Sequence, residues 1–446
     1  MTMLSRLKSF IPAAALVFWA LFATAPALAV TVERVVSPGG IEAWLVRDHT
    51  NPIISMRFAF RGGAALDPKG LGGLANMVAS LLDEGAGGLD SKAFQAKLED
   101  LVITLRYDAG RDTFGGNLKT LVENRDTAFD LLRLSLTRPR FDREPVERIR
   151  SQILAGLRQE SEEPGAIGRK TLMKTLFPGH PYGRPADGTE ATVARVTRAD
   201  LKGFAAQRLA RNNLVIGIVG DIKAEALKPL LDKTFGGLPA KAASWDIPDA
   251  EPQGAGRTIV IEKPVPQSSI VYAEKGLKRQ NPDFFAAYIM NHVFGGGGFT
   301  SRLYTTVREK RGLAYSVYST LHPLDHAGLI VGSAATANAR VAETIQVIRQ
   351  EWARMARDGM TETEIKDAKT FLTGSYPLRF TSSGRIASML VGIQLDNLGI
   401  DYMDRRNGLI EAVTLADVNR TAAKYLLEDR LTIVIVGQPE GITPTQ

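Results

Sequence analysis

Two stretches of the sequence carry polar residues at a spacing that metal sites use. His322 and His326 in H-P-L-D-H are four residues apart with Asp325 between them, and on a helix both imidazoles would share one face. However, Pro323 lies inside the segment, and strand-like apolar runs flank it on both sides. Because proline breaks a helix, we predict a polar hairpin turn here and no metal site.

The second stretch, Gly73–Gly85, has the apolar period of a helix and a polar pair on the opposite face. Asn76 and Ser80 are one turn apart on that face, as paired ligands of a helical zinc site would be. Neither an amide nor a hydroxyl is a good zinc ligand. The stretch therefore has the layout of a metal-binding helix without its donors. We expect His180, in G-H-P-Y-G, to pack or cap in a loop.

The composition excludes several other chemistries. The chain of 446 residues has no cysteine, so it can form no disulfide, thiolate nucleophile or cysteine metal site. Its net charge is +7, but the basic residues are dispersed, and Glu309 interrupts the densest cluster, Arg308–Arg311. A nucleic-acid interface would concentrate this charge, so we expect no nucleic-acid partner.

A run of four glycines raises a separate question of use. The run consists of Gly295, Gly296, Gly297 and Gly298. No G-K-S/T follows it, so it is not a phosphate-binding loop of the P-loop type. Because such a run costs backbone entropy, it indicates a flexible loop or a loop with a function.

The first 29 residues have the pattern of an export signal. Arg6 and Lys8 precede an apolar stretch, and Ala27–Ala29 supplies the small residues that signal peptidase accepts. An uncleaved anchor is the alternative, because Ser9–Val32 carries no charge. The small-residue site favours cleavage. We therefore expect a periplasmic or secreted protein with no transmembrane span once the signal is removed.

The elements that must position these residues come in two copies. Val196–Asp221 matches Val413–Gln438 at a constant offset of 217, with 12 of 26 positions identical and no gap. In both copies a T-x-x-D capping box opens a helix, and a β-branched run that reads as a buried strand follows. A period of this length indicates two homologous domains.

The predicted organisation follows from this duplication. We place a signal peptide at 1–29, an N-terminal domain at 30–237, a linker rich in Gly, Pro and Ala at 238–257 and a C-terminal domain at 258–446. The predicted strands are 53–60, 214–219, 268–273, 314–320, 328–333 and 431–436, of which 314–320 and 328–333 form a hairpin. The predicted helices are 91–101, 121–136, 143–159 and 342–357. Elements in this order favour an α+β fold, with helices covering largely antiparallel sheets.

Four stretches of the chain resemble the pitrilysin/insulinase family, the inverted-zincin peptidases, and together they span nearly the whole mature chain. They are P-I-I-S-M-R-F-A-F-R-G-G-A-A-L-D-P with the helix after it, Phe177–Thr197, Phe294–Ser319 and the pair of duplicated domain ends. The resemblance implies the fold of the processing peptidases and LuxS-like metallohydrolases, with two homologous domains in a clam-shell arrangement.

The resemblance also implies that the zinc site has been lost. Active members bind zinc through H-x-x-E-H and a distant glutamate. Aligned on G-L-A, the three motif positions are Asn76, Ala79 and Ser80, and the distant ligand would be expected near Ala155 or Gly156. None of these supplies a suitable donor, so we expect no metal in this chain and zinc in a partner subunit.

In the second half, Arg308 and Tyr315 match an arginine and a tyrosine that reach the zinc site in active members of the family. An arginine can grip a substrate carbonyl, and a tyrosine hydroxyl can donate to an oxyanion. Glycine-rich loops such as Gly295–Gly298 occur in inactive partner subunits of the family, which implies a contact with substrate.

The leading hypothesis is therefore a non-catalytic subunit of a periplasmic heterodimeric zinc peptidase. Arg308 and Tyr315 would complete the active site of a zinc-bearing paralogous subunit, and an extended peptide would pair with a sheet edge. The alternative is a peptidase-like scaffold or peptide-binding protein with no proteolytic role. A third hypothesis, a peptidase active alone, would need a zinc site that the sequence does not supply.

Overall fold

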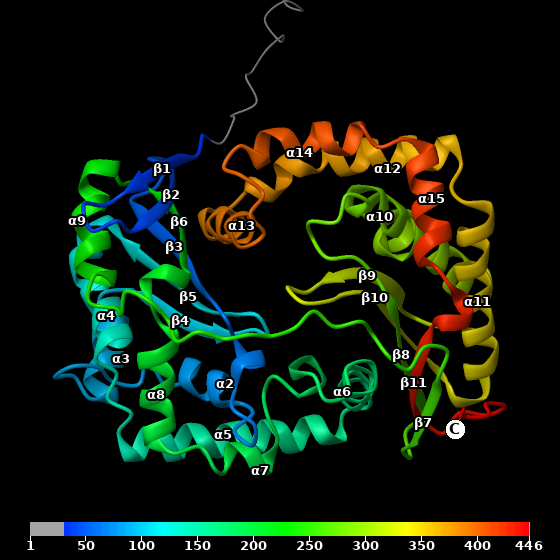
Figure 1. The fold of residues 1–446 in the computed structure, drawn as a ribbon, viewed down its shortest axis with the longest axis horizontal. Coiled ribbons are helices and arrows are strands. Elements are labelled where there is room, and N and C mark those ends of the chain that lie inside the picture. The colour runs from blue at the N-terminus through cyan, green and yellow to red at the C-terminus, as the bar shows by residue number, and fades with distance from the viewer. Residues whose placement is uncertain (1–30, 446) are drawn as a thin grey trace, which may run out of the picture.

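The computed structural model describes residues 31–445, and it contains two β-sheets that lie on opposite sides of the molecule (Figure 1). The predicted signal peptide, 1–29, lies outside the described residues. The N-terminal sheet has the strand order β1-β2-β6-β3-β5-β4, and the C-terminal sheet has the order β7-β11-β8-β10-β9. The strands of the first sheet are β1 (Glu33–Val36), β2 (Glu42–Arg47), β3 (Ile53–Arg61), β4 (Thr104–Ala109), β5 (Thr113–Leu121) and β6 (Leu214–Gly220). Those of the second are β7 (Thr258–Glu262), β8 (Gln267–Lys275), β9 (Val317–Pro323), β10 (Gly328–Ala337) and β11 (Thr432–Gly437).

The two sheets are copies of one design. Strands β2, β6, β3, β5 and β4 correspond in order to β7, β11, β8, β10 and β9, and in each sheet one parallel pair, β2–β6 or β7–β11, joins otherwise antiparallel ladders. A packing detail is repeated as well. Phe58 pairs with Gly116 across one sheet, and Tyr272 pairs with Gly332 across the other. In both sheets the aromatic ring lies over the glycine, where any Cβ would collide with it.

Helices cover the outer face of each sheet and enclose a hydrophobic core there. Over the N-terminal sheet these are α2 (Leu74–Ala79), α3 (Ser91–Asp100), α4 (Arg125–Thr137), α8 (Arg198–Arg208) and α9 (Ala224–Phe235). Over the C-terminal sheet they are α10 (Phe284–Asn291), α11 (Val341–Asp358), α12 (Glu362–Gly374) and α15 (Leu415–Tyr425). The remaining helices are α5 (Arg143–Glu162), α6 (Pro164–Leu176), α7 (Glu190–Val193), α13 (Ser383–Leu395) and α14 (Tyr402–Glu411).

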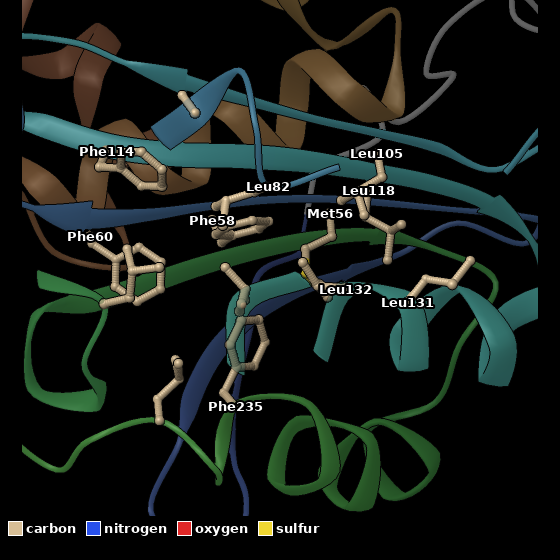
Figure 2. Packing of buried hydrophobic residues seen from close by; sticks show 14 of the residues in the cluster. Met56, Phe58, Phe60, Leu82, Leu105, Phe114, Leu118, Leu131, Leu132 and Phe235 are labelled. Carbon is tan, nitrogen blue, oxygen red and sulfur yellow. The ribbon is translucent and has the colours of Figure 1, made fainter. Parts of the chain in front are cut away.

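Aromatic side chains from the strands fill the N-terminal core. Phe58 packs edge-on against Phe60 and against Phe235 of α9, with ring centroids 6.2 and 6.0 Å apart (Figure 2). Leu131 and Leu132 of α4 lie on the same side of the sheet. All five side chains are buried, and burial at this level stabilises the fold by about 2 kcal/mol for each large side chain.

The inner face of each sheet is covered by a helix from the other half. Helix α6, from the N-terminal half, packs Leu172 and Leu176 against Val271 and Val436 of the C-terminal sheet. Helix α13, from the C-terminal half, packs Ile386, Leu390 and other apolar side chains against the N-terminal sheet. The two helices hold equivalent places in their halves. The duplication therefore produces a reciprocal exchange in which each half completes the core of the other (Figure 1).

Most predicted elements are confirmed, and three need correction. The hairpin of β9 and β10 and both T-x-x-D capping boxes form as predicted. The helix predicted at 121–136 begins only at Arg125, because β5 continues to Leu121. The strand predicted at 314–320 begins at Val317, where pairing with β10 starts. The helix expected in Gly73–Gly85 ends at Ala79, after only six residues.

The segment between the sheets runs without helix or strand from Gly236 to Arg257 (Figure 1). It is held to both halves by backbone hydrogen bonds, from Ala243 N–H to Gln207 O and from Ala250 N–H to His326 O. The domain boundaries at 237 and 257 stay a prediction, since α6 and α13 each pack across them. Among residues 31–445, no helix is both long and apolar enough to cross a membrane.

Candidate functional site

The helix that resembles a zinc helix is held by a buried carboxylate at its N-terminus. Asp67 accepts hydrogen bonds from the backbone N–H groups of Gly73 and Ala75, at 2.8 and 3.0 Å. Burial raises the pKa of Asp67 to about 7, and the two N–H donors oppose that rise. This carboxylate is occupied in capping α2, and so it is a structural group of the helix.

The side chains of α2 do not fit a zinc ion. Ser80, at the second-histidine position, donates its hydroxyl to the Asn76 carbonyl oxygen at 3.0 Å, and Ala79 is buried. Of the three motif positions, only Asn76 retains a polar side-chain group that could face a metal, and that group is an amide. Zinc sites require imidazole, thiolate or carboxylate ligands, so these positions cannot coordinate the metal.

Helix α5 supplies no third ligand. Ala155 and Gly156, where the resemblance implies one, are both exposed, and a Cβ at Gly156 would meet nothing within 4 Å. The buried residue on this turn is Leu157, whose side chain has no donor atom. Among residues 31–445, no group of three or more His, Asp or Glu side chains is placed to hold a metal ion.

The histidines have structural neighbours. His322 lies near the end of β9 and His326 lies in the turn that follows, so H-P-L-D-H leads into the hairpin turn that the sequence predicted. His326 Nδ1 lies 3.5 Å from Asp249 Oδ1. His180 caps a short turn by accepting the N–H of Tyr182 at 3.1 Å, which confirms the predicted capping role. The His292 ring stacks on Phe371.

Arg308 and Tyr315 come together at the surface of the C-terminal half. Arg308 lies in a π-helical turn, η7 (Tyr304–Glu309), and its guanidinium carbon is 4.4 Å from the ring centre of Tyr315 and 4.9 Å from that of Tyr304. Tyr315 is 80% exposed. Within the described part of the chain Arg308 has no ion pair, whereas its neighbour Arg311 reaches Glu343. A cation and a phenol are therefore held side by side and face solvent.

This pair occupies a place where the two halves differ. The segments G-A-G-G-L-D-S (85–91) and G-G-G-G-F-T-S (295–301) start equivalent stretches, and the hydrogen bonds from Ile103 N–H to Leu98 O and from Leu313 N–H to Val307 O match Leu98 with Val307, the residue before Arg308. The next turn is again equivalent, since Val102 and Gly312 both have positive φ, 52° and 58°. Leu98 is buried in the N-terminal core. Val307 is buried in the same way, and Arg308, the next residue of the π-helical turn, is half-buried.

Tyr315 has no counterpart in the N-terminal half. Ile103 corresponds to the buried Leu313, and the strands resume at Leu105 and Val317, as their pairing registers show. Between these points the C-terminal half has residues 314–316, whereas the N-terminal half has only Thr104. The two additional residues leave the sheet and carry the tyrosine outward. This insertion also explains why the strand predicted from Ala314 starts three residues later.

The glycine run is accounted for by close packing and backbone conformation. A Cβ on Gly295 would lie 2.4 Å from Ser319 Oγ of β9, and one on Gly296 would lie 2.6 Å from the Asn291 side chain. Gly297 would meet His292 O at 2.6 Å, and Gly298 has a φ of +62° in open space. These contacts explain all four glycines without a ligand. A contact between the run and substrate stays a prediction.

An ion pair that the sequence analysis missed fixes the start of the segment bearing Arg308. The guanidinium of Arg302 donates to both carboxylate oxygens of Glu364 on α12, at 2.7 and 2.6 Å. Burial pushes the pKa of Glu364 upward, but Arg302 and the N–H of Thr361 outweigh it and lower that pKa to about 2. The T-x-x-E capping box at Thr361 was the available sequence signal for Glu364.

Each sheet has two edge strands, β1 and β4 in the first and β7 and β9 in the second, to which an extended peptide could be added. The edge of β9 is already engaged at Ser319, whose carbonyl accepts from Asn291 and whose backbone lies against Gly295. The chemistry that this chain offers is therefore limited. Within residues 31–445 it presents a cation with a phenol, and sheet edges, and no group of three or more His, Asp or Glu side chains placed to hold a metal ion.

Comparisons with known proteins agree with the absence of zinc ligands at the motif positions of α2. A family model described as "Peptidase M16 inactive domain" matches residues 195–372, a span that includes parts of both halves. The "Non-peptidase homolog YmxG" of Helicobacter pylori is 29% identical over 391 residues, which are 87% of this chain and 90% of that protein. An "Uncharacterized zinc protease" of Mycobacterium tuberculosis is 28% identical over 352 residues, 74% of this chain and 78% of that protein.

A solved structure is similar over almost the full length of the chain. The crystal structure of a peptidase M16 inactive domain from Pseudomonas fluorescens superimposes with a TM-score of 0.87 and 29% sequence identity. The match covers 93% of this chain and all of that one. Its α+β architecture, with two helix-covered sheets, is that of the present chain.

Proposed function

The chain belongs to the M16 family of peptidases, the pitrilysin/insulinase family, as an inactive member, and from this premise we propose that it is the non-catalytic subunit of a heterodimeric zinc peptidase. Its partner would be a paralogous subunit with an intact H-x-x-E-H helix, and the assembly would work in the periplasm or outside the cell. Peptides would be the substrate.

One observation carries this proposal. Arg308 and Tyr315 are held against each other at the surface, and within residues 31–445 no ion pair or hydrogen bond of their side chains uses them in the fold. An unpaired guanidinium beside an exposed phenol is a ready set of donors for a developing oxyanion supplied by another molecule. We propose that both side chains enter the partner's active site, where Tyr315 donates to the oxyanion and Arg308 binds the substrate carbonyl.

The empty zinc positions fit the same division of roles. The α2 positions hold an amide, a methyl group and a hydroxyl engaged with backbone, so these positions supply no group that would activate water. A subunit of this kind contributes to hydrolysis only through what it presents to its partner.

The test is to purify the chain alone and together with a co-expressed zinc-bearing relative, and to assay cleavage of peptides by each preparation. We expect cleavage only by the complex, with loss of activity on chelation. Arg308→Ala or Tyr315→Phe should lower kcat about 10²–10³-fold, the usual effect of removing one oxyanion donor. Arg311→Ala, which removes a neighbouring exposed arginine, is the matched control and should leave activity unchanged.

Two results would contradict the proposal. Chelator-sensitive cleavage by the isolated chain would mean that it is a peptidase by itself. A complex that is equally active with Arg308→Ala and Tyr315→Phe would favour the alternative function, a scaffold or peptide-binding protein.

A further inference from the structure

A cavity between the two halves is built from residues that no step of the proposed function uses. It has a volume of about 350 Å³, near the lower end of the range for small-ligand sites. Its apolar wall comes from Leu172 of α6 together with Val271 and Val331 of the C-terminal sheet. The cavity occupies the part of the inner sheet face that α6 leaves uncovered.

The polar lining of this cavity is mainly cationic. Four basic side chains face it against two acidic ones. The basic residues are Arg111, Arg169, Lys170 and Arg184, and the acidic residues are Glu160 and Asp187. Glu160 is already paired with Lys170 at 2.7 Å. The arginines therefore exceed the free carboxylates, and the interior of the cavity attracts an anion.

Arg111 is a half-buried charge of this lining. It extends from the β4–β5 turn of the N-terminal half, and its Nη1 donates to the backbone oxygens of Tyr182 and Arg184, at 2.8 and 2.9 Å. No carboxylate pairs with it among the described residues. Burial lowers the pKa of Arg111, but a guanidinium stays protonated at neutral pH. The charges of Asp112 and Asp187 stabilise the guanidinium from beyond ion-pair distance, and an anion in direct contact would complete its hydrogen bonds.

Hydroxyl groups and an imidazole stand opposite these arginines. Tyr318 of β9 pairs with Ser333 of β10, and both side chains face the cavity beside His322. Burial lowers the pKa of His322, and the nearby charge of Arg111 lowers it further, while Asp112 acts in the opposite direction. The site thus joins an apolar wall, a fixed cation and neutral donors.

We propose that this cavity binds the carboxylate of an extended peptide, with the neighbouring apolar side chain of that peptide against Leu172 and Val271. The carboxylate is the peptide's own C-terminus or the side chain of an acidic residue, since both have the same chemistry. Arg111 and Arg169 hold the carboxylate, and Tyr318 and Ser333 complete its hydrogen bonds. The site belongs to this chain alone and needs no zinc.

The experiment measures binding by calorimetry to the purified full chain, with three N-acetylated hexapeptides of alanine, valine and leucine. One ends in a free carboxylate, one ends in an amide, and one ends in an amide but carries a glutamate at its last position. We expect the amide peptide without glutamate to bind at least about tenfold more weakly than the free acid, because it lacks a charged hydrogen-bond acceptor. Binding of the glutamate peptide would identify a side chain as the source of the carboxylate.

Matched variants locate the site. Arg169→Gln should weaken binding of the free acid several-fold, whereas Lys174→Gln, an exposed residue outside the cavity on the same helix, should not. Arg111→Gln should weaken it more, with a thermal unfolding curve to show that the variant is folded. A second readout is the His322 imidazole proton resonance, identified through His322→Gln. Its pKa should rise when an anion offsets the charge of Arg111.

Equal binding of acid and amide, or binding unaffected by Arg169→Gln and Arg111→Gln, would overturn this proposal. So would a His322 pKa that does not change at saturation with the free acid. These outcomes are independent of the peptidase assay, because no partner subunit is present. Loss of activity on Tyr315→Phe in the complex would stand even if the cavity bound nothing.

Discussion

Leu98 and Arg308 lie in corresponding segments of the two halves, yet Leu98 is buried in a core, whereas Arg308, which follows the buried Val307, is only half-buried. The helices that carry them differ in the same way. Helix α3 is a regular α-helix with an Asp90 cap, whereas its counterpart η7 is a π-helical turn. π-Helical turns are rare and are frequently found at functional sites. The comparison shows that the C-terminal copy kept the sheet and changed the element beside its edge strand.

The largest effect on stability should come from Leu98→Arg, and Arg308→Leu is its comparison. Leu98→Arg buries a charge without a partner and should lower the free energy of unfolding by about 4 kcal/mol or more. Arg308→Leu should change it by less than about 1 kcal/mol, because only contacts with two aromatic rings are lost. Chemical denaturation followed by circular dichroism measures both. Equal losses would mean that Arg308 is as much a core residue as Leu98.

A second comparison concerns the exchanged helices. A Cβ on Gly217 of β6 would lie 2.6 Å from the Ala387 carbonyl oxygen of α13, so Gly217→Ala should cost about 2–3 kcal/mol. In the other sheet the glycine is on the helix, and a Cβ on Gly168 of α6 would lie 3.0 Å from a Val271 methyl group. Gly168→Ala should change stability by no more than about 1 kcal/mol, since alanine also favours the helix. Thermal unfolding of both variants gives the comparison.

If Gly168→Ala proved the more damaging of the two, the fit of α6 rather than that of α13 would be the tighter one.

The Arg302–Glu364 ion pair exists only in the C-terminal half. The equivalent residues are Lys92, which is exposed, and Pro145, which stands three residues after the N-cap of its helix as Glu364 does. Arg302→Gln should cost about 2 kcal/mol at pH 7, because Glu364 then loses its charged donors. Lys92→Gln is the control and should cost nothing measurable.

The same pair sets a dependence on pH. The pKa of Glu364 is lowered to about 2 from its ordinary value near 4.5. The unfolded chain therefore binds this proton more readily, and the stabilisation is complete above pH 4.5 and is lost as the pH falls toward 2. In Arg302→Gln this part of the acid dependence should disappear in unfolding curves measured between pH 7 and pH 2. An unchanged slope would show that the pair does not stabilise the fold.

The smallest expected effect on stability comes from the turn that follows α3 and from its counterpart after η7. Val102 has a φ of +52°, which is strained for a β-branched residue, and it is 71% exposed. Val102→Gly should therefore raise the free energy of unfolding by about 1 kcal/mol, and Gly312→Val should lower it by a similar amount. Denaturant midpoints for the two variants test this, and a loss of stability in Val102→Gly would show that its side chain packs usefully.

Sequence patterns could predict the repeated framework but not the places where the halves depart from it. The capping boxes at Thr197 and Thr414 and the buried strands after them follow from local chemistry, so they were recognisable in both copies. The start of the helix after β5 was misplaced because Leu121 continues the helical period while its backbone pairs with Ile53 of β3. Tertiary pairing decided that position.

For the candidate site, residue types could be predicted and contacts could not. The absence of ligands at Asn76 and Ser80 was visible in the sequence. That Arg308 lies against Tyr304 depends on a π-helical turn, which no spacing rule indicates. The cavity beside Arg111 depends on chain segments from both halves, and local periodicity carries no information about such neighbours.

The exchange of α6 and α13 determines when each sheet can be covered on its inner face during synthesis. The N-terminal sheet has all its strands once Gly220 has left the ribosome, but its inner face stays bare until residues 383–395 follow. Contacts so distant in the chain form slowly. Until then an apolar surface that includes Trp44 and Val219 remains open to aggregation or to a chaperone. The inner face of the N-terminal sheet is therefore covered only after α13 has been synthesised.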